Sequence, residues 1–184
     1  MSQLGGDGTW VPTAHNVGVY HFFGLLAHAA AIGRSVMTAP ENEGRRGPYR
    51  ISTDRARLDF AVIHGFLTTA YWSPIIGRAA VERAARHSLP FGLYEDSGDG
   101  KERQIGYARV LTDYVGMASV HDVFVLETHR GHGLALWLMQ VILAHPELAE
   151  VRSWLLKTRA AHGFYARLGF AAPPDPERYM VRRR

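Results

Sequence analysis

A basic, glycine-rich loop at residues 130–135 has the residue types that bind phosphate. Arg130 is followed by Gly131, His132 and Gly133. Glycine lacks a Cβ, so the backbone there can turn tightly and point its amides outward. A helix that starts directly after such a loop leaves its first N–H groups unpaired and places the positive end of its dipole there. The sequence therefore predicts a site for a phosphate-bearing ligand.

The spacing within this loop excludes two familiar phosphate-binding motifs. A dinucleotide-binding G-x-G-x-x-G/A pattern that begins at Gly131 would need glycine or alanine at position 136, which is Leu136. A P-loop ends in G-K-[ST], a tripeptide that the sequence lacks. The pattern that remains is Arg130-x-x-Gly133-x-Ala135, with an apolar run before it and an amphipathic helix pattern after it.

A second pattern with chemical potential lies downstream, at residues 158–170. Its apolar residues recur at helical spacing from Ala161 to Leu168, and Gly169 is placed to end the helix in the left-handed conformation. The helix carries Tyr165, whose hydroxyl can donate a proton to a leaving group.

In this order and spacing, the two patterns resemble the GNAT superfamily of N-acetyltransferases. Residues 130–135 match its Q/R-x-x-G-x-G/A signature. Residues 158–170 match its fourth-helix pattern, N-x-x-A-x-x-[LF]-Y-x-x-x-G-F, except that Thr158 replaces asparagine. The resemblance covers about residues 49–182. It implies an α+β fold with a mixed sheet flanked by helices, and a parallel strand pair splayed at the CoA site.

The resemblance also implies the reaction and the residues that bind its donor. Acetyl-CoA would be a co-substrate, and its acetyl group would move to a primary amine by direct attack in a ternary complex. The loop backbone would hold the pyrophosphate, and the backbone before the loop would pair with pantetheine as an extra strand would. The expected donor-binding residues are Val125, Glu127, Arg130, Gly131, His132, Gly133, Leu134, Ala135, Thr158 and His162.

Three residues are candidates for proton transfer. A departing CoA thiolate, with a pKa of roughly 8.5, benefits from a proton donor, and the resemblance assigns this role to Tyr165. An acceptor amine with a pKa of about 10 is protonated at neutral pH and must lose its proton before attack. His121 and Asp122 lie on the predicted strand before the loop, where alternation sends neighbours to opposite faces. We favour His121 as the base, through a water; the alternative is that no dedicated base exists.

The acceptor pocket is expected between the first two helices and the late strands. Its aromatic residues would pack against the body of a small amine or amino-acid-like acceptor, while Asp113 would meet its charge. The alternative for each residue is ordinary packing. The candidates are Tyr71, Trp72, Asp113, Tyr114 and Tyr179. No metal is expected, because His129 and His132 flank a glycine in a loop rather than sharing a helical face.

The elements that must position these residues follow an α+β order. We expect strands at 49–51, 91–95, 104–113, 118–126, 151–157 and 178–182. We expect helices starting at Ser52 or Thr53, at 78–87, at 134–143 and around Tyr165. Residues 91–113 read as a hairpin, and strand–helix–strand around the loop implies a parallel pair.

The rest of the chain predicts an N-terminal extension or linker at 1–48 and a single GNAT domain at 49–184. Residues 22–32 favour a short helix, and 39–48 an exposed linker. We hypothesise that residues 1–36 are an accessory segment, or an upstream extension of a chain that starts at Met37. The apolar run at 22–32 is too short to span a bilayer and lacks signal-peptide features, so the default is a cytoplasmic protein.

Composition leaves two other functions open. With no cysteine, the chain has no disulfide, thiolate metal site or cysteine acyl-enzyme. A catalytically silent acyl-CoA sensor on the same fold would keep the loop but would not need Tyr165. The formal net charge is +4, with arginines at 178 and 182–184, and it permits a nucleic-acid partner. No aromatic–basic patch supports one, and a solvated tail is favoured. The sequence leaves the acceptor unidentified, and it does not distinguish a monomer from a homodimer.

Overall fold

A computed structural model of the chain describes residues 44–73, 75–98 and 100–182. In this part of the chain, six strands form one sheet in the order β1-β2-β3-β4-β5-β6. They are β1 (Gly44–Arg46), β2 (Tyr49–Ser52), β3 (Leu89–Asp96), β4 (Glu102–Thr112), β5 (Met117–Val125) and β6 (Ser153–Leu156). Neighbouring strands are antiparallel except for β5 and β6, which run parallel. The predicted mixed sheet, its hairpin and its parallel pair are confirmed.

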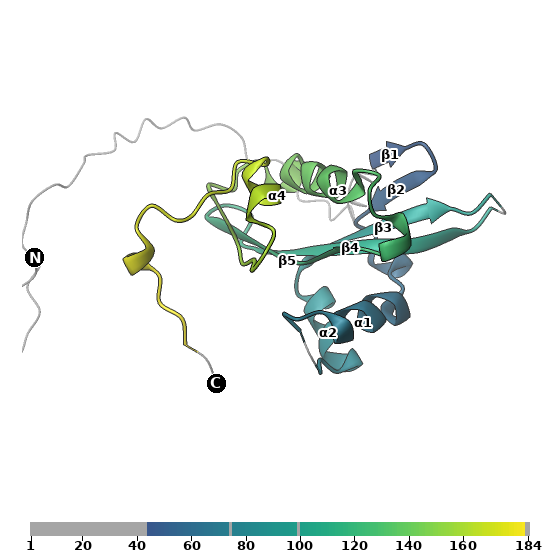
Figure 1. The fold of residues 1–184 in the computed structure, drawn as a ribbon, viewed down its shortest axis with the longest axis horizontal. Coiled ribbons are helices and arrows are strands. Elements are labelled where there is room, and N and C mark those ends of the chain that lie inside the picture. The colour runs from purple at the N-terminus through teal and green to yellow at the C-terminus, as the bar shows by residue number, and fades with distance from the viewer. Residues whose placement is uncertain (1–43, 74, 99, 183–184) are drawn as a thin grey trace, which may run out of the picture. The chain divides into compact units, whose positions relative to one another are not determined.

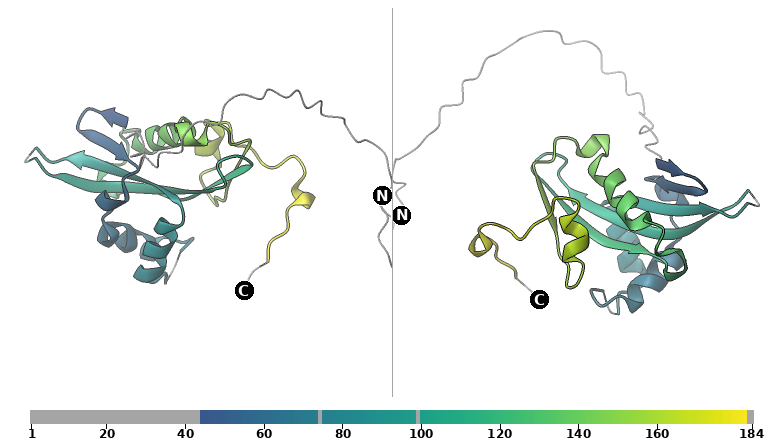
Figure 2. Two further views of the ribbon diagram at one scale, coloured as in Figure 1. Left: turned by 180° about the vertical axis from the view of Figure 1, so that it is seen from behind. Right: turned by 45° about the horizontal axis from the view of Figure 1, so that its top comes forward.

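The helices cover both faces of this sheet. They are α1 (Phe60–Thr69), α2 (Arg78–Arg86), α3 (Leu134–Leu143) and α4 (His162–Ala166). In Figure 1, α1 and α2 lie on one face of the sheet, and α3 and α4 lie on the other. Figure 2 shows α3 and α4 from a second direction, across the strands. Short 3-10 helices connect the elements at η1 (Arg55–Arg57), η2 (Glu127–His129), η3 (Pro146–Leu148) and η4 (Pro176–Arg178).

Two apolar clusters hold the helices to the sheet. On the α3 face, Leu138, Met139 and Ile142 are fully buried against the strands. On the α1 face, Ile63 and Leu67 pack with Tyr107 and Phe124. Burying a Leu or Ile side chain contributes about 1.5–3 kcal/mol, so these clusters are the main attraction between layers. No helix in the described residues is long and apolar enough to cross a membrane.

The first helix starts later than the sequence predicts. Ser52 or Thr53 was expected as its cap, but Asp59 caps α1, and its carboxylate accepts from the N–H groups of Ala61 and Val62. The Ser52 hydroxyl instead accepts from the N–H of Asp54, which in turn caps η1. Several residues in this stretch can act as helix caps, and tertiary packing selects among them.

The predicted linker at 39–48 contributes a strand. Residues 44–46 pair with β2 as β1, across a turn in which Gly47 has φ +58°. Gly44 lies so close to Trp137 and Val141 of α3 that a Cβ there would be 3.1 Å from each. The predicted extension up to residue 43, including the expected helix at 22–32, lies outside the described residues. The domain boundary at residue 49 stays a prediction.

The predicted final strand at 178–182 is wrong. The chain forms η4 there and then continues unpaired, with Tyr179, Met180 and Val181 all more than half exposed. The prolines at 173, 174 and 176 precede this segment, and Pro176 begins η4, where the fixed φ of proline suits a first helical position. In the described part of the chain, the outer edge of β6 has no partner strand. Arg183 and Arg184 lie outside the described residues.

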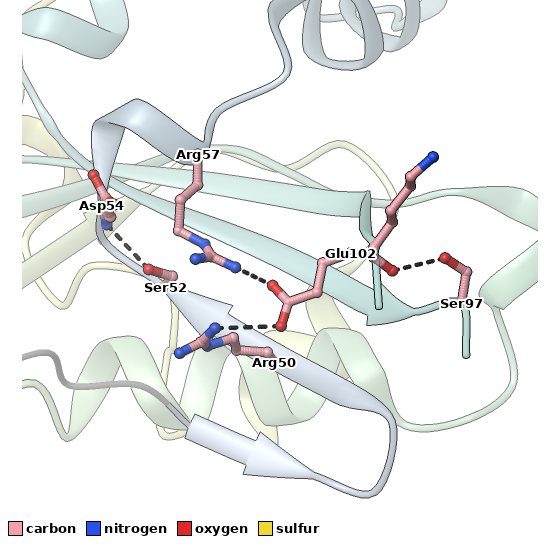
Figure 3. Close-up of polar contacts among 7 residues, drawn as sticks. Arg50, Ser52, Asp54, Arg57, Ser97 and Glu102 are labelled. Atoms are coloured by element: carbon pink, nitrogen blue, oxygen red, sulfur yellow. Dashed lines mark hydrogen bonds and ion pairs between the residues drawn. The ribbon is translucent and has the colours of Figure 1, made fainter. Parts of the chain in front are cut away.

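Arginine contacts connect the early elements to the sheet. The Glu102 carboxylate of β4 forms an ion pair with Arg50 of β2, at 3.2 Å, and another with Arg57 of η1, as Figure 3 shows. Arg55 donates to the carbonyl of Ala85, in the last turn of α2, at 2.5 Å, and to that of Ser88, just after α2, at 2.8 Å. These contacts fix the connection that leads into α1.

Candidate active site

A gap opens where β5 and β6 diverge. The two strands pair only from Met117 opposite Ser153 to Val120 opposite Leu156. Beyond Val120, β5 runs on to Val125 with no partner on that side among the described residues. The divergence coincides with a β-bulge, because the β4–β5 register shifts between Tyr107 and Arg109. A bulge bends its strand and locally increases the twist.

A cavity of about 480 Å³ lies at this gap. Residues from the α1–α2 connection, from β4, β5 and β6, and from the start of α4 line it. Six of the predicted site residues meet there: Tyr71, Trp72, His121, Asp122, Thr158 and Tyr165. They come from positions up to 94 residues apart (71 to 165), so the fold alone brings them together.

His121 and Asp122 both line this cavity, as do Val120 and Val123 on either side of them. Asp122 has φ +54° at the bulge, which interrupts strict strand alternation there. The Asp122 carboxylate accepts from Arg109 Nε at 2.5 Å, and both side chains are largely buried. Asp122 is therefore committed to an ion pair.

His121 is the group in the cavity best suited to accept a proton. Its Nε2 hydrogen-bonds to the Ser119 hydroxyl at 2.9 Å. Burial lowers the pKa of His121 below its usual value, and the nearby charge of Arg109 lowers it further. The imidazole is thus neutral at neutral pH.

Tyr165 faces the same cavity as a protonated hydroxyl. Its half-buried ring contacts Phe164 edge to face, at 4.9 Å between centroids, and Phe170 at 6.0 Å. Burial raises the pKa of Tyr165, with a smaller contribution from Tyr71. A phenol that keeps its proton in this pH range is a donor rather than a base.

The start of α4 contacts the α1–α2 connection across the cavity. The Tyr71 hydroxyl accepts from the Arg159 backbone N–H at 3.1 Å, and the Arg159 guanidinium lies 4.0 Å from the centroid of the Tyr71 ring. Beside it, Thr158 Oγ1 accepts from the Ala161 N–H at 3.0 Å. A hydroxyl has one hydrogen to donate, so Thr158 can still donate to a ligand.

The phosphate loop lines a second cavity, of about 300 Å³. Gly131 and Gly133 both have positive φ, at +84° and +71°, as a tight loop requires. Gly133 is the N-cap of α3 and makes no side-chain capping bond, so the first N–H groups of α3 have no side-chain acceptor at the cap. No atom outside its neighbours lies within 4 Å of a Cβ placed on Gly131, so a phosphate has room to approach. The geometry fits an anionic ligand.

Most predicted loop residues line this second cavity. They are Val125, Arg130, Gly131, Gly133, Leu134 and Ala135. His132 does not line it, and its Nδ1 donates to the His129 carbonyl at 3.3 Å. Glu127 is exposed and 3.8 Å from Arg130, and His162 is exposed at the start of α4. Neither Glu127 nor His162 lines either cavity.

Two arginines that the sequence analysis missed lie at the loop. Arg46 of β1 reaches over Gly133, with its Nη1 3.6 Å from where a Cβ would stand. Arg167, just after α4, lines the loop cavity. Arg46 had no sequence signal, because its segment reads as a linker. Arg167 lies inside the tyrosine-helix pattern, at a position where that pattern accepts any residue.

Three predicted acceptor residues lie elsewhere. Asp113 is in the β4–β5 turn, where its Oδ1 accepts from the backbone N–H groups of Val115, Gly116 and Met117, and these bonds lower its pKa. Tyr114 is exposed in the same turn, and Tyr179 is exposed in the C-terminal segment. None of the three lines the cavity that holds Tyr165. Among the residues that the structure describes, no cluster of three His, Cys, Asp or Glu side chains is placed to hold a metal.

Comparison with known proteins is consistent with this geometry. A family model described as the acetyltransferase (GNAT) domain matches residues 86–172. A Gibberella zeae protein assigned as an acetyltransferase is 32% identical over 152 residues, which cover 72% of this chain and 84% of that relative. The chloroplastic serotonin N-acetyltransferase 2 of Oryza sativa subsp. japonica is 32% identical over 102 residues, covering 55% of this chain and 51% of the relative.

Solved structures of two other proteins are similar to this chain. A structure from Xanthomonas campestris pv. campestris, assigned to the acetyltransferases of the GNAT family, is 43% identical. It superimposes with a TM-score of 0.69, over 73% of this chain and 92% of its own. A protein of Deinococcus radiodurans R1, also assigned as an acetyltransferase, shares the fold at 22% identity, with a TM-score of 0.59 over 77% of this chain and 92% of its own.

Proposed function

The chain belongs to the GNAT family of acetyltransferases, and on that premise we propose that it moves an acetyl group from acetyl-CoA to a primary amine. One observation carries the proposal. The glycine-rich loop at 130–135 lines one cavity, and Tyr165 and His121 line a second one where β5 and β6 diverge.

The donor would bind along that gap. The loop amides and the first turn of α3 would bind the pyrophosphate, with Arg46 and Arg167 adding positive charge. Pantetheine would lie along the unpaired edge of β5, where backbone groups can pair with its amides as they would with a strand. Thr158 would donate a hydrogen bond from the far side of the gap.

The acetyl group would pass directly to the amine. The amine nitrogen attacks the thioester carbonyl, a C–N bond forms and the C–S bond breaks. His121 takes the proton that the amine loses, through a water, and Tyr165 protonates the departing sulfur and is reprotonated from solvent. Alignment of amine and carbonyl in one cavity can contribute roughly 7–11 kcal/mol to lowering the barrier.

The acceptor would be a small amine whose body packs against Tyr71 and Trp72. The rice relative's name points to an arylethylamine such as serotonin, and the two aromatic rings suit a flat acceptor. The alternative is a silent acyl-CoA sensor. Tyr165 and His121 favour an enzyme, because a sensor needs neither group in the cavity.

Thiol release from acetyl-CoA across a panel of primary amines tests the proposal. We expect turnover with the wild-type protein, and a loss in kcat of about a hundredfold or more in Tyr165→Phe, since a positioned general acid contributes that much. Tyr179→Phe is the matched control, because Tyr179 is exposed and outside the cavity. It should keep full activity.

Binding measured separately distinguishes the alternatives. A hundredfold excess of acetyl-CoA over its Kd should stabilise the fold by about 2.7 kcal/mol. Saturable binding without turnover on any amine would establish the sensor instead. A melting temperature that acetyl-CoA leaves unchanged would contradict both functions.

A further inference from the structure

We propose that the acceptor amine carries an anionic group, a carboxylate or a phosphate, in addition to its amine. The inference rests on the proposed acetyl transfer and concerns the acceptor half of the same cavity. It distinguishes amino-acid-like or phosphate-bearing amines from purely cationic arylethylamines.

The charges that line the cavity are unbalanced. Arg109 and Lys157 are its cations, and Asp122 is its only carboxylate among the described lining residues. Arg109 and Asp122 neutralise each other at 2.5 Å, with side chains only 15% and 11% exposed. Lys157 lines the cavity, is exposed, and makes no ion pair with another described residue, so it is accessible to a charged ligand.

A further cation lies at the rim of the cavity. The Arg159 guanidinium is held over the Tyr71 ring at 4.0 Å, and Tyr71 itself lines the cavity. The hydrogen bond from the Arg159 N–H to the Tyr71 hydroxyl fixes the two residues side by side. Lys157 lines the cavity, and Arg159 contacts Tyr71, which lines it too, so both residues place positive charge beside the acceptor space.

The pKa of His121 is also affected by the charges around the cavity. Burial lowers the pKa of His121, and both Arg109 and Lys157 lower it further, against the single opposing effect of Asp122. An environment that disfavours a protonated imidazole disfavours an ammonium group in the same way. The cavity thus helps an amine to lose its proton, but a purely cationic molecule gains nothing from Lys157.

An acceptor that carries both an amine and an anionic group would match the aromatic and the basic parts of this cavity. Its carbon body would lie against Tyr71 and Trp72, whose rings meet edge to face at 5.0 Å and are 47% and 43% exposed. Its amine would lie toward His121, and its carboxylate or phosphate toward Lys157 and Arg159. Charge-assisted hydrogen bonds to either anion are stronger than neutral ones, so the anion would anchor and orient the acceptor.

Paired amines test this inference. Each pair differs only in the anionic group: tryptophan and tryptamine, phenylalanine and phenethylamine, phosphoethanolamine and ethanolamine. We expect kcat/KM to be higher by up to about fivefold for the anionic member of the pair that fits the cavity, which is the upper range for a single exposed ion pair. The carboxylate and phosphate pairs identify which anion is preferred.

Charge reversal at one residue sharpens the test. Lys157→Glu should lower kcat/KM for the anionic amines by roughly tenfold relative to kcat/KM for the matching amines that lack the anion. Arg152→Glu is the matched control, because Arg152 is exposed at the other end of β6 and carries the same change in net charge. It should not alter the preference.

The outcomes separate this inference from the proposed function. Turnover that is equal for both members of every pair, or faster for the purely cationic ones, would overturn the anionic acceptor and leave acetyl transfer standing. If no amine is acetylated, calorimetry of the same pairs on the CoA-bound protein still decides. A Lys157-dependent preference for the anionic members would support the anion site, and equal binding would overturn it.

Discussion

At the scale of single residues, Asp122 determines the shape of the cavity. Its φ of +54° lies in the left-handed region, which residues other than glycine seldom occupy. The ion pair with Arg109 on the neighbouring strand holds it there. His121, Asp122 and Tyr165 all line the same cavity.

Removing one member of this pair should destabilise the protein. Asp122→Ala leaves the largely buried Arg109 without a partner, and we expect a loss of about 3 kcal/mol in the free energy of unfolding, measured in urea. The double variant Arg109→Ala/Asp122→Ala should recover part of that loss. Equal stability of the single variant and the wild type would show that the pair does not hold the bulge.

His121 should set the acid limb of the pH–rate profile. It can accept a proton only when neutral, and its lowered pKa keeps it neutral below its usual value of about 6.5. We therefore expect kcat/KM to persist as the pH falls through 6.5 and to decline only below it. His121→Gln should lower kcat and remove that limb. A profile that is unchanged in the variant would favour a mechanism without a dedicated base.

The two arginines at the phosphate loop should act on the donor alone. Arg46→Ala and Arg167→Ala should each raise the KM for acetyl-CoA by up to about fivefold with kcat unchanged, because in the proposed complex they would contact the donor and not the reacting atoms. Arg45→Ala is the control, as this neighbour on β1 lines a different surface. Unaltered KM in both variants would exclude them from the donor site.

At the scale of elements, the connection between α3 and β6 depends on a buried histidine. His145 directly precedes η3, and its Nδ1 accepts from the Glu147 N–H at 3.3 Å. It is only 5% exposed and meets the Phe91 ring edge to face at 5.4 Å. Burial lowers the pKa of His145, so the folded protein prefers its neutral form.

Stability should therefore fall in mild acid. Because the folded pKa is below the unfolded value of about 6.5, the contribution of neutral His145 is complete above 6.5. It is lost as the pH falls from 6.5 through the folded pKa, where the unfolded chain binds the proton first. Urea unfolding at pH 7.5 and pH 5.0 should show this decline, and His145→Asn should reduce it. His121 acts in the same direction, so the variant should reduce the decline without abolishing it.

Elements with strong local signals were predictable from the sequence, and those set by distant contacts were not. The β3–β4 hairpin, the loop before α3 and the turn at Gly169 that follows α4 are each consistent with local spacing and turn chemistry. The strand β1 depends on packing against α3, and the bulge at Asp122 depends on Arg109 thirteen residues earlier. The late start of α1 depends on competition among nearby caps.

The residues of the candidate site also divide into those that a local sequence pattern marks and those that it does not. Six of the predicted residues line one cavity. They could be predicted because two of the three segments that supply them lie in or next to a recognisable sequence pattern. Lys157, Arg109 and Arg46 were missed, since a lone basic residue has no spacing that marks its destination. Asp113 was predicted to meet a substrate charge, but it satisfies the N–H groups of its own turn, as an Asp in such a turn commonly does.

At the scale of the described molecule, the parallel pair of the sheet is held by a short ladder. β5 and β6 pair over four residues, from Met117 to Val120, whereas β3 and β4 pair from Leu89 to Asp96. Segments with few paired groups open locally at lower free energy than those in the centre of a sheet. The part of the chain from β6 through α4 should thus open before β3 and β4 do.

Hydrogen exchange followed by mass spectrometry should reveal this difference. We expect peptides from residues 151–170 to exchange faster than peptides from residues 102–112. Saturating acetyl-CoA should slow exchange in residues 151–170 and in the loop at 130–135, because the donor would contact both sides of the gap. Protection confined to the loop would indicate that pantetheine does not enter between the strands.

The unpaired edge of β5 beyond Val120 also offers a route to inhibitors. It is a short row of backbone donors and acceptors with an aromatic wall at one end and a phosphate-binding loop at the other. A compact strand mimetic that ends in an acidic group could occupy this row without carrying adenine or three phosphates. Selectivity would then come from the aromatic end, where Tyr71 and Trp72 lie, rather than from the loop geometry that the chain shares with its family.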